Sequence, residues 1–299
     1  MVAGFALFGC RGKLLEKKSG PALVDFENEV RRAIAQSGGA LELVQVPMPS
    51  AIRFQNSWGI GNHKNSSSNR FGMAIDLDLC NGCGKCILAC NMENNIPLVS
   101  EENAQRNRFM HWIQMHGGVP FMCAHCGSAP CEKVCPTGAA NHTPDGISTM
   151  MYKRCTGSRF CGANCPLHAR KFNFDDASEL GLSRKFNASV PLRSKGVMEK
   201  CSMCIQRLQD NRLRFKTELG QKESLAMNAN EKHNGDLSEW RGRGIKTACA
   251  EACPKGAIIF GNWLDENSPL VRAAKHRVLY APAAVAGFDP SVVYMQGNR

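Results

Sequence analysis

Four cysteines stand within one short stretch, Cys80-Asn-Gly-Cys83-Gly-Lys-Cys86-Ile-Leu-Ala-Cys90. This spacing lets a short loop wrap three thiolates around one cubane iron-sulfur cluster, while the fourth cysteine starts a helix and reaches a different cluster. Zinc sites instead use pairs of cysteines separated by a longer spacer. Disulfides between such close neighbours would be strained. The spacing therefore predicts iron-sulfur clusters.

The residues before this loop are typical of a strand. Apolar residues alternate with small or polar ones from Phe71 to Leu79, which predicts a half-buried strand that leads directly to Cys80. Upstream, an amphipathic helix is expected between residues 21 and 39, and a short strand over Leu41–Val46. Residues 61–70 are polar and show neither a helical nor a strand period, so they are interpreted as a linker.

Three further cysteine motifs follow along the chain. They are Cys123-x2-Cys126-x4-Cys131-x3-Cys135, Cys155-x5-Cys161-x3-Cys165, and Cys201-x2-Cys204 with Cys249-x3-Cys253. In the last motif, a polar and charged segment of 44 residues separates the two cysteine pairs. We expect this segment to form a helix over about 205–219, followed by a surface loop.

The third motif lacks one ligand. Ser158 stands where the spacing would place the second of four cysteines. Three thiolates leave one corner of a cubane without its natural ligand, so a 3Fe-4S cluster is the expected occupant. The serine oxygen is a poorer match than a thiolate for this metal-sulfur core.

The cysteine count fits four clusters, because the motifs supply fifteen ligands and the shortfall falls at Ser158. In a two-cluster ferredoxin the last cysteine of each motif ligates the partner cluster. If one such unit is inserted in another, the first motif pairs with the fourth and the second with the third. The predicted ligand sets are then Cys80, Cys83, Cys86 and Cys253; Cys90, Cys201, Cys204 and Cys249; Cys123, Cys126, Cys131 and Cys165; and, for the 3Fe-4S cluster, Cys135, Cys155 and Cys161.

The expected fold class is α+β, with two bacterial-ferredoxin-like units, one inserted in the other. Residues 1–70 are assigned to an N-terminal extension and linker. The double-ferredoxin domain spans 71–262, and its inserted unit covers about 118–175. Residues 263–299 form an apolar tail that is expected to pack on a partner or on the core, and it is assigned to docking.

The formal net charge of +11 suggests nucleic acid or an anionic membrane as a partner. Each oxidised cluster with its thiolates carries about −2, however, so four clusters would remove roughly 8 units. Basic residues also lie beside the cysteines, where they would compensate buried anionic sites: Lys85, Lys133, Arg154, Arg159, Arg170, Lys171, Lys200 and Arg207. Without a stacking or groove-reading motif, we predict no nucleic-acid partner.

Other functional classes fit the sequence less well than an electron-transfer subunit. A soluble polyferredoxin would have similar cysteines, but the long extension and the apolar tail favour docking surfaces. A zinc-stabilised binding module is disfavoured by the spacing. Catalysis by the chain itself is not expected, because the histidines near the motifs are more often packed or hydrogen-bonding residues than proton carriers: His111, His125, His142 and His168.

The longest uninterrupted apolar run, Met1–Cys10, is shorter than the ~20 residues of a membrane-spanning helix. Leu7–Cys10 loosely resembles a lipoprotein cleavage site, but the preceding segment lacks a charged start, so a free cysteine is expected. Arg31 and Arg32 precede a polar segment and not the apolar segment of a twin-arginine signal. Export with a signal-bearing partner is left open.

Several stretches outside the cysteine spacing resemble a known family. They are Cys90-Asn-Met-Glu-Asn-Asn-Ile-Pro97, Met110-His-Trp-Ile113, Arg154-Cys-Thr-Gly-Ser-Arg-Phe-Cys161, Arg170-Lys-Phe-Asn-Phe174 and Gly196-Val-Met-Glu-Lys-Cys-Ser-Met-Cys204. The chain resembles the four-cluster iron-sulfur subunits of the complex iron-sulfur molybdoenzyme family. Within it, the chain is similar to those of the bacterial quinone reductase complex and of alternative complex III, which share the missing ligand.

The resemblance implies a peripheral position on the bacterial inner membrane, at the periplasmic face. It implies three partners: an integral quinone-binding subunit of the polysulfide-reductase type, a molybdopterin-enzyme-like subunit and a multihaem cytochrome c. The function it implies is transfer of electrons from periplasmic cytochromes to menaquinone. Alternative complex III usually fuses its iron-sulfur part behind a molybdopterin-like domain, so the quinone reductase complex is preferred. Alternative complex III, another molybdopterin oxidoreductase and a soluble polyferredoxin remain alternatives.

Overall fold

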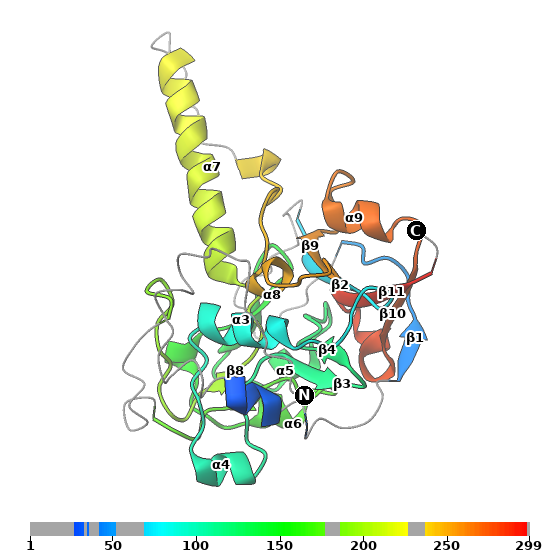
Figure 1. Cartoon of the computed structure of the whole chain (residues 1–299). Coiled ribbons are helices and arrows are strands. Elements are labelled where there is room, and N and C mark those ends of the chain that lie inside the picture. The colour runs from blue at the N-terminus through cyan, green and yellow to red at the C-terminus, as the bar shows by residue number, and fades with distance from the viewer. Residues whose placement is uncertain are drawn as a thin grey trace.

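The computed structural model describes residues 27–32, 35, 42–51, 69–176, 186–226 and 237–297. Within the predicted amphipathic stretch, residues 27–32 are helical. Most of the expected linker, residues 61–68, lies outside the described residues, and so does Cys10. The elements form a mixed α/β molecule with one larger sheet beside a group of short helices and hairpins (Figure 1).

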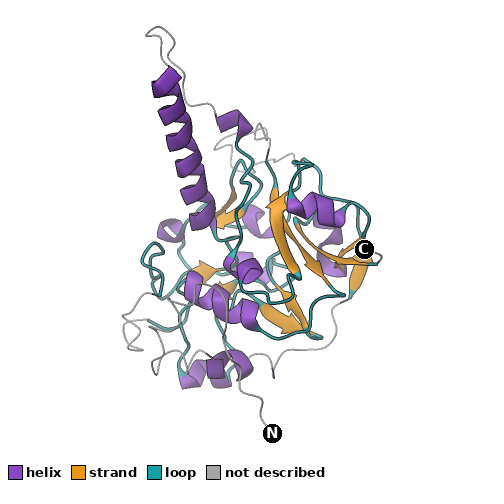
Figure 2. Ribbon diagram, turned by 45° about the horizontal axis from the view of Figure 1, so that its top comes forward, coloured by secondary structure: helices purple, strands orange, loops and turns teal. Residues whose placement is uncertain are grey.

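The larger sheet has five strands in the order β1-β10-β11-β2-β9 (Figure 2). Their bounds are Leu43–Gln45 for β1, Val278–Pro282 for β10, Val292–Gln296 for β11, Phe71–Asp76 for β2 and Ile258–Asn262 for β9. The pair β11–β2 is parallel and the other three pairs are antiparallel. β1 falls inside the strand predicted over Leu41–Val46, which confirms that prediction.

Strand β2 is buried on both faces, whereas the sequence predicts a half-buried strand. Phe71, Met73 and Ile75 belong to the main core. The opposite face carries small residues, and Ala74 packs into a second core that includes Trp263. The alternation is therefore one of large and small residues. It does not separate a buried face from a solvated one.

The C-terminal tail packs on the core of the protein itself. Its helix α9 (Pro269–Ala274) contacts β9, and β11 pairs with β2 in the middle of the sheet. A 3₁₀ helix, Ala283–Phe288, joins β10 to β11. The sequence left open whether the tail packs on a partner or on the core, and in the structure its described part packs on the core. This part of residues 263–299 belongs to the same sheet as β2 and β9, so the sheet does not mark a boundary before the tail.

The helices that follow the cysteine loops pack in two pairs. Helix α3 (Lys85–Glu93) contacts α8 (Ala248–Glu251), and α5 (Pro130–Lys133) contacts α6 (Phe160–Ala163). Three antiparallel strand pairs accompany them. Two are hairpins, β3 (Gln114–His116) with β4 (Val119–Phe121) and β5 (Ala140–His142) with β6 (Ser148–Met150), and the third pairs the more distant strands β7 (Lys171–Phe172) and β8 (Met198–Glu199). The remaining short elements are α4 (Glu101–Gln105) and 3₁₀ turns at Tyr152–Arg154 and Leu237–Glu239.

Helix α7 (Ile205–Ala226) begins directly after Cys204 and projects from the body of the molecule (Figure 1). The helix predicted over 205–219 is thus confirmed, and it extends further to Ala226. Its base is fixed by Trp240, whose indole N–H donates to the Asn211 side chain at 3.0 Å. Leu208 of the same helix is buried in the main core.

Candidate iron-sulfur centres

The structure gathers the cysteines of the four motifs into four groups. Group 1 is Cys80, Cys83, Cys86 and Cys253; group 2 is Cys90, Cys201, Cys204 and Cys249; group 3 is Cys123, Cys126, Cys131 and Cys165; group 4 is Cys135, Cys155 and Cys161. Members of each group act on one another electrostatically. All fifteen are free cysteines. These groups have the same members as the ligand sets that the spacing predicts.

The loop of group 1 needs glycine. Gly82 and Gly84 have φ angles of 67° and 72°, the left-handed region that lets the chain turn around a central point. A Cβ at Gly82 would lie 2.7 Å from the Gly118 carbonyl oxygen, so the hairpin of β3 and β4 closes the loop from outside. All four cysteines of group 1 line one small cavity here, together with Met115.

Group 2 is rich in hydrogen-bond donors to sulfur. The Asn94 amide is 3.5 Å from the Cys90 sulfur, and the Thr247 hydroxyl is 3.1 Å from that of Cys249. Backbone N–H groups of Met203 and Ala248 donate to Cys201 and Cys204. Such donors favour the thiolate over the thiol and hold each sulfur in place.

As bare thiols, these cysteines would be hard to ionise. Burial, followed by repulsion from other cysteine sulfurs, raises the pKa of Cys86 and of Cys249 to about 12. Burial likewise raises the pKa of Cys131 to about 11, although Arg170 opposes it. Cations at the centre of each group would offset both penalties, because a coordinating thiol is deprotonated by its metal. The donor set therefore fits an iron-sulfur core.

A single metal ion has different requirements. No three Cys, His, Asp or Glu side chains in the described part of the chain lie close enough to share one ion. A cubane takes one thiolate at each of its iron corners, and its ligands stand further apart than those of one ion.

Arg170 lies between groups 3 and 4. Its guanidinium donates to the Cys131 sulfur at 3.1 Å, is only 5% exposed and also acts electrostatically on Cys161. The next residue, Lys171 in β7, acts on Cys165 instead. The two adjacent cations therefore act on different sulfurs of group 3, and Arg170 acts on group 4 as well.

Group 4 sits near the surface. Ser158 is exposed in the loop between Cys155 and Cys161, where Gly157 and Arg159 both have positive φ angles. Burial tends to raise the pKa of Cys135, but backbone N–H groups, among them that of Ala140, outweigh it and lower that pKa. Exposed Arg154 and Arg159 flank the group.

The groups follow one another in a line. Cys249 of group 2 acts electrostatically on Cys86 of group 1, which places these two groups side by side. Cys123 of group 3 acts in the same way on Cys201 of group 2. Arg170 connects group 3 to group 4. Groups 1, 2, 3 and 4 are therefore neighbours in this order.

Comparison with known proteins gives the family. Residues 67–139 match the model of a 4Fe-4S dicluster domain. The chain is 33% identical to the menaquinone reductase iron-sulfur cluster-binding subunit of Nitratidesulfovibrio vulgaris, over 76% of this chain and 88% of that one. This chain belongs to the iron-sulfur subunits of the complex iron-sulfur molybdoenzyme family.

Two further relatives widen the range of complexes. The Hdr-like menaquinol oxidoreductase iron-sulfur subunit 1 of Archaeoglobus fulgidus is 31% identical, over 75% of this chain and 82% of that one. The B subunit of the polysulfide reductase of Wolinella succinogenes is 25% identical, over 78% of this chain and 97% of that one. Iron-sulfur subunits of this family are electron carriers of quinone-linked respiratory complexes, and so is this chain. None of its described helices has the length and apolar character required to cross a bilayer.

Sequence reasoning did not single out several buried residues of this iron-sulfur subunit. Arg193 and Glu199 form a fully buried ion pair of 2.8 Å, and the same guanidinium donates to the Asn94 carbonyl beside group 2. Arg70, also fully buried, binds Asp289 and Ser291 and acts on Cys126. Nothing in the spacing marks these residues, because the elements that they join are far apart in sequence.

The histidines of this iron-sulfur subunit have mostly packing roles. Asn91 donates to His111 Nδ1 at 2.7 Å, and His142 is 2.5 Å from Glu132. His125 is completely buried next to Cys126, and burial holds its pKa well below the usual value. His168 is exposed.

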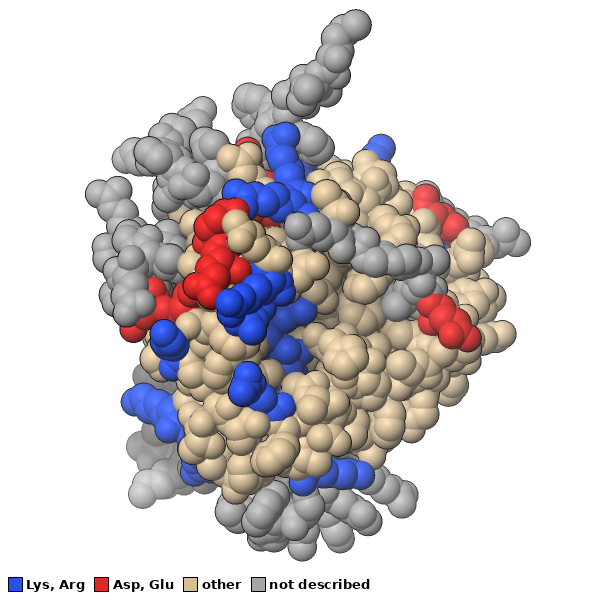
Figure 3. Space-filling model, turned by 90° about the horizontal axis from the view of Figure 1, so that it is seen from below, with Lys and Arg blue, Asp and Glu red and all other residues tan. Residues whose placement is uncertain are grey.

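Charges on the surface of the iron-sulfur subunit are mixed. Seen from below, Lys and Arg side chains gather in one zone beside a strip of Asp and Glu (Figure 3). Helix α4 contributes two exposed ion pairs, Arg32–Glu101 and Arg106–Glu102, each with a 2.9 Å contact. Part of the basic excess is therefore compensated by neighbouring carboxylates.

Proposed function

We propose that the chain carries three 4Fe-4S clusters, in groups 1 to 3, and one 3Fe-4S cluster in group 4. The single observation that supports this best is the line of four thiol groups, with fewer ligands at its exposed end. Clusters held by cysteine thiolates accept and release single electrons, and the cysteines stay in place as ligands. A line of them inside one chain conducts electrons between two distant surfaces.

The same contacts support two nested ferredoxin-like units. The helix of the first motif packs on that of the fourth, and the helix of the second packs on that of the third. Each of the four groups includes one cysteine from the partner motif: Cys253 in group 1, Cys90 in group 2, Cys165 in group 3 and Cys135 in group 4. This is the exchange of ligands that two-cluster ferredoxins use.

In this proposal the relay connects a periplasmic multihaem cytochrome c to the membrane menaquinone pool. The chain lies on the periplasmic face of the bacterial inner membrane, against an integral quinone-binding subunit of the polysulfide-reductase type and a molybdopterin-enzyme-like subunit. The names of the relatives support a quinone partner, since one is a menaquinone reductase subunit and another a menaquinol oxidoreductase subunit. The second of these names also supports a second candidate function, electron flow from quinol, which is the direction expected for the iron-sulfur subunit of alternative complex III.

Iron and zinc analysis of this subunit, isolated from the native complex with its clusters in place and free of haem, tests the cluster content. We expect about 15 iron atoms in this chain, no zinc, and a 3Fe-4S signal in low-temperature EPR of the oxidised protein. A value near 8 iron atoms, or zinc in place of iron, would contradict four clusters.

A second measurement tests the quinone link. Membranes that contain the complex are expected to reduce a menaquinone analogue with reduced cytochrome c as the electron donor. A purified chain that carries its clusters but associates with no membrane subunit would instead favour the soluble polyferredoxin.

A further inference from the structure

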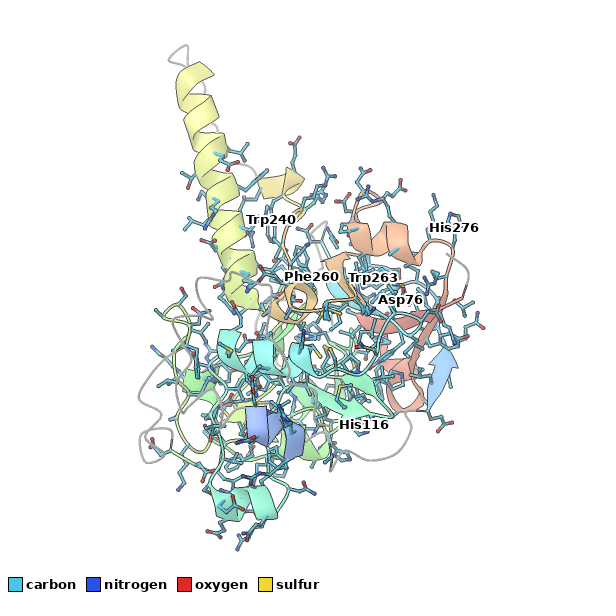
Figure 4. The ribbon with its side chains drawn as sticks, viewed as in Figure 1. Asp76, His116, Trp240, Phe260, Trp263 and His276 are labelled. Carbon is cyan, nitrogen blue, oxygen red and sulfur yellow. The ribbon has the colours of Figure 1, made fainter. Side chains whose placement is uncertain are left out.

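A cavity of about 520 Å³ lies beside the iron-sulfur groups and has no part in the relay described above. Its walls come from five separate segments, among them the β3–β4 hairpin, the residues after Cys165 and the 3₁₀ helix of the tail. His116 marks the hairpin side, well away from Trp240, Phe260 and Trp263 (Figure 4). The cavity is the size of a small organic molecule and is open to solvent on one side.

Among the described residues that line the cavity, Lys171 is the one Lys or Arg. It is half-buried, and burial lowers the pKa of its ammonium to about 8, so the group is still mainly charged at pH 7. Among the described residues, the only opposite charge that acts on it is the Cys165 thiolate. An oxidised cluster bound at group 3 would carry about −2 with its thiolates, so part of the charge of the ammonium would be offset from that side.

The histidines do not supply a second charge. Burial lowers the pKa of His111 to about 4, and burial and then Lys171 lower the pKa of His116. His111 accepts a hydrogen bond from Asn91 through Nδ1, so its proton is on Nε2, which faces Glu29 at 3.5 Å. Nδ1 is therefore hydrogen-bonded and Nε2 lies near a carboxyl group, so the imidazole lines the cavity as an uncharged ring.

Aromatic rings form much of the wall. Phe109 and His111 are stacked with their planes 7° apart and their centres 5.8 Å apart. His116 and Phe121 form a tilted pair at 4.7 Å on the adjacent strands of the hairpin. Flat faces of this kind pack well against a planar ring. Glu42, the one carboxylate among the described residues that line the cavity, is exposed.

We propose that this cavity binds a planar aromatic anion, whose charged group pairs with Lys171 and whose ring lies between the Phe109–His111 and His116–Phe121 pairs. The ligand lies next to the relay. Ile87 follows Cys86 of group 1 and also lines the cavity, and Leu167 lines it two residues after Cys165 of group 3. An anion at this place would lower the potentials of both neighbouring clusters, because it opposes their negative reduced forms. The binding itself does not depend on the cluster assignment.

Calorimetric titration of the native complex with two probes tests the proposal. The first is 2-naphthoate, a planar anion, and the second is its neutral counterpart 2-naphthamide. We expect one site per chain, with naphthoate bound about tenfold more tightly than the amide, the equivalent of about 1.4 kcal/mol. Lys171→Gln is expected to remove this difference, and Lys171→Arg to retain it. Lys275→Gln, at an exposed lysine beyond α9, serves as the matched control and leaves both affinities unchanged.

A second variant tests the cavity independently of its charge. Ala283 lines the cavity from the tail, so Ala283→Phe fills it and is expected to abolish binding of both probes. Iron content and absorption near 400 nm, measured on every variant, separate this test from the cluster assignment. The proposal is overturned if neither probe binds, if Lys171→Gln binds naphthoate like the natural protein, or if a folded Ala283→Phe variant retains both affinities.

Discussion

Ser158 occupies the position of a missing thiolate in group 4, and the loop leaves it exposed. Replacing Ser158 with Cys restores the expected spacing, so we predict that the 3Fe-4S cluster becomes a 4Fe-4S cluster with a lower potential. In the proposed relay, group 4 is the end nearest the quinone-binding subunit, so transfer to the quinone would then weaken while the other three clusters assemble normally. Low-temperature EPR of the oxidised complex and quinone turnover measure the two effects.

The two readouts of Ser158→Cys contradict different claims. A 3Fe-4S signal that persists would show that Ser158 is not the vacant ligand position. Loss of the signal with unchanged turnover would leave the ligand assignment intact. It would refute group 4 as the port on the quinone side.

Arg170 gives a second prediction at this scale. A buried cation stabilises the more negative, reduced form of a cluster, so it raises the reduction potential. Arg170→Gln is therefore expected to lower the potentials of the clusters in groups 3 and 4 together. Redox titration followed by EPR measures both.

The exposed pair Arg154 and Arg159 provides the matched control for Arg170. Solvent and salt screen these charges, so their Gln variants are expected to shift the potential of group 4 much less. Equal shifts from all three variants would show that burial does not decide the effect. The sequence counted Lys171 among the basic residues beside the cysteines, and in the structure it acts on Cys165 and lines the cavity.

Spacing could predict the membership of the four cysteine groups because most members of each group lie close together along the chain. It could not identify the residues that tune them. Asn94 and Thr247 donate to sulfurs of group 2, and Arg70 reaches group 3 from a different strand. These partners are brought together by the tertiary fold, and no local period or motif carries that information.

At the scale of elements, the N-terminal helical residues 27–32 are attached to the body through a buried carboxyl group. Glu29 accepts the Val99 N–H at 3.2 Å and faces His111. The pKa of Glu29 is raised from 4.5 to about 7, and burial is the largest cause of this shift. The folded state therefore prefers the protonated form.

A pH dependence follows from Glu29. Its contribution to stability is fully present below about pH 4.5 and is lost as pH rises to about 7, a change of about 3 kcal/mol. Glu29→Gln stays neutral and is expected to remove this dependence. Amide hydrogen exchange of residues 27–32 at pH 5 and pH 8 measures it.

The exposed Glu266→Gln variant is the control for Glu29, and its exchange is expected to keep the pH dependence of the natural protein. The exchange rates are first corrected for the intrinsic chemical rate at each pH. If the corrected rates of residues 27–32 then rise with pH by the same factor in Glu29→Gln as in the natural protein, the role of the buried carboxyl group is contradicted.

Local patterns predicted some elements better than others. The start of α7 and the strand before Cys80 were predicted because each carries a clear period or boundary in sequence. The place of β11 beside β2 could not be predicted, since more than 200 residues separate the paired positions in the parallel register, as between Met73 and Val292. Only long-range pairing decides that the tail completes the sheet.

At the scale of the whole molecule, the order of the groups makes group 2 a necessary step, because Cys249 acts on group 1 and Cys201 faces group 3. We predict that Cys249→Ala removes one cluster, lowers the iron content to about 11 atoms and leaves the 3Fe-4S signal in place. Electron transfer falls steeply with distance, so turnover between cytochrome and quinone should nearly vanish. Cys10→Ser, at the one cysteine outside the motifs, should change neither quantity. Full turnover in a Cys249→Ala complex that has lost its second cluster would show that electrons take a route that bypasses group 2.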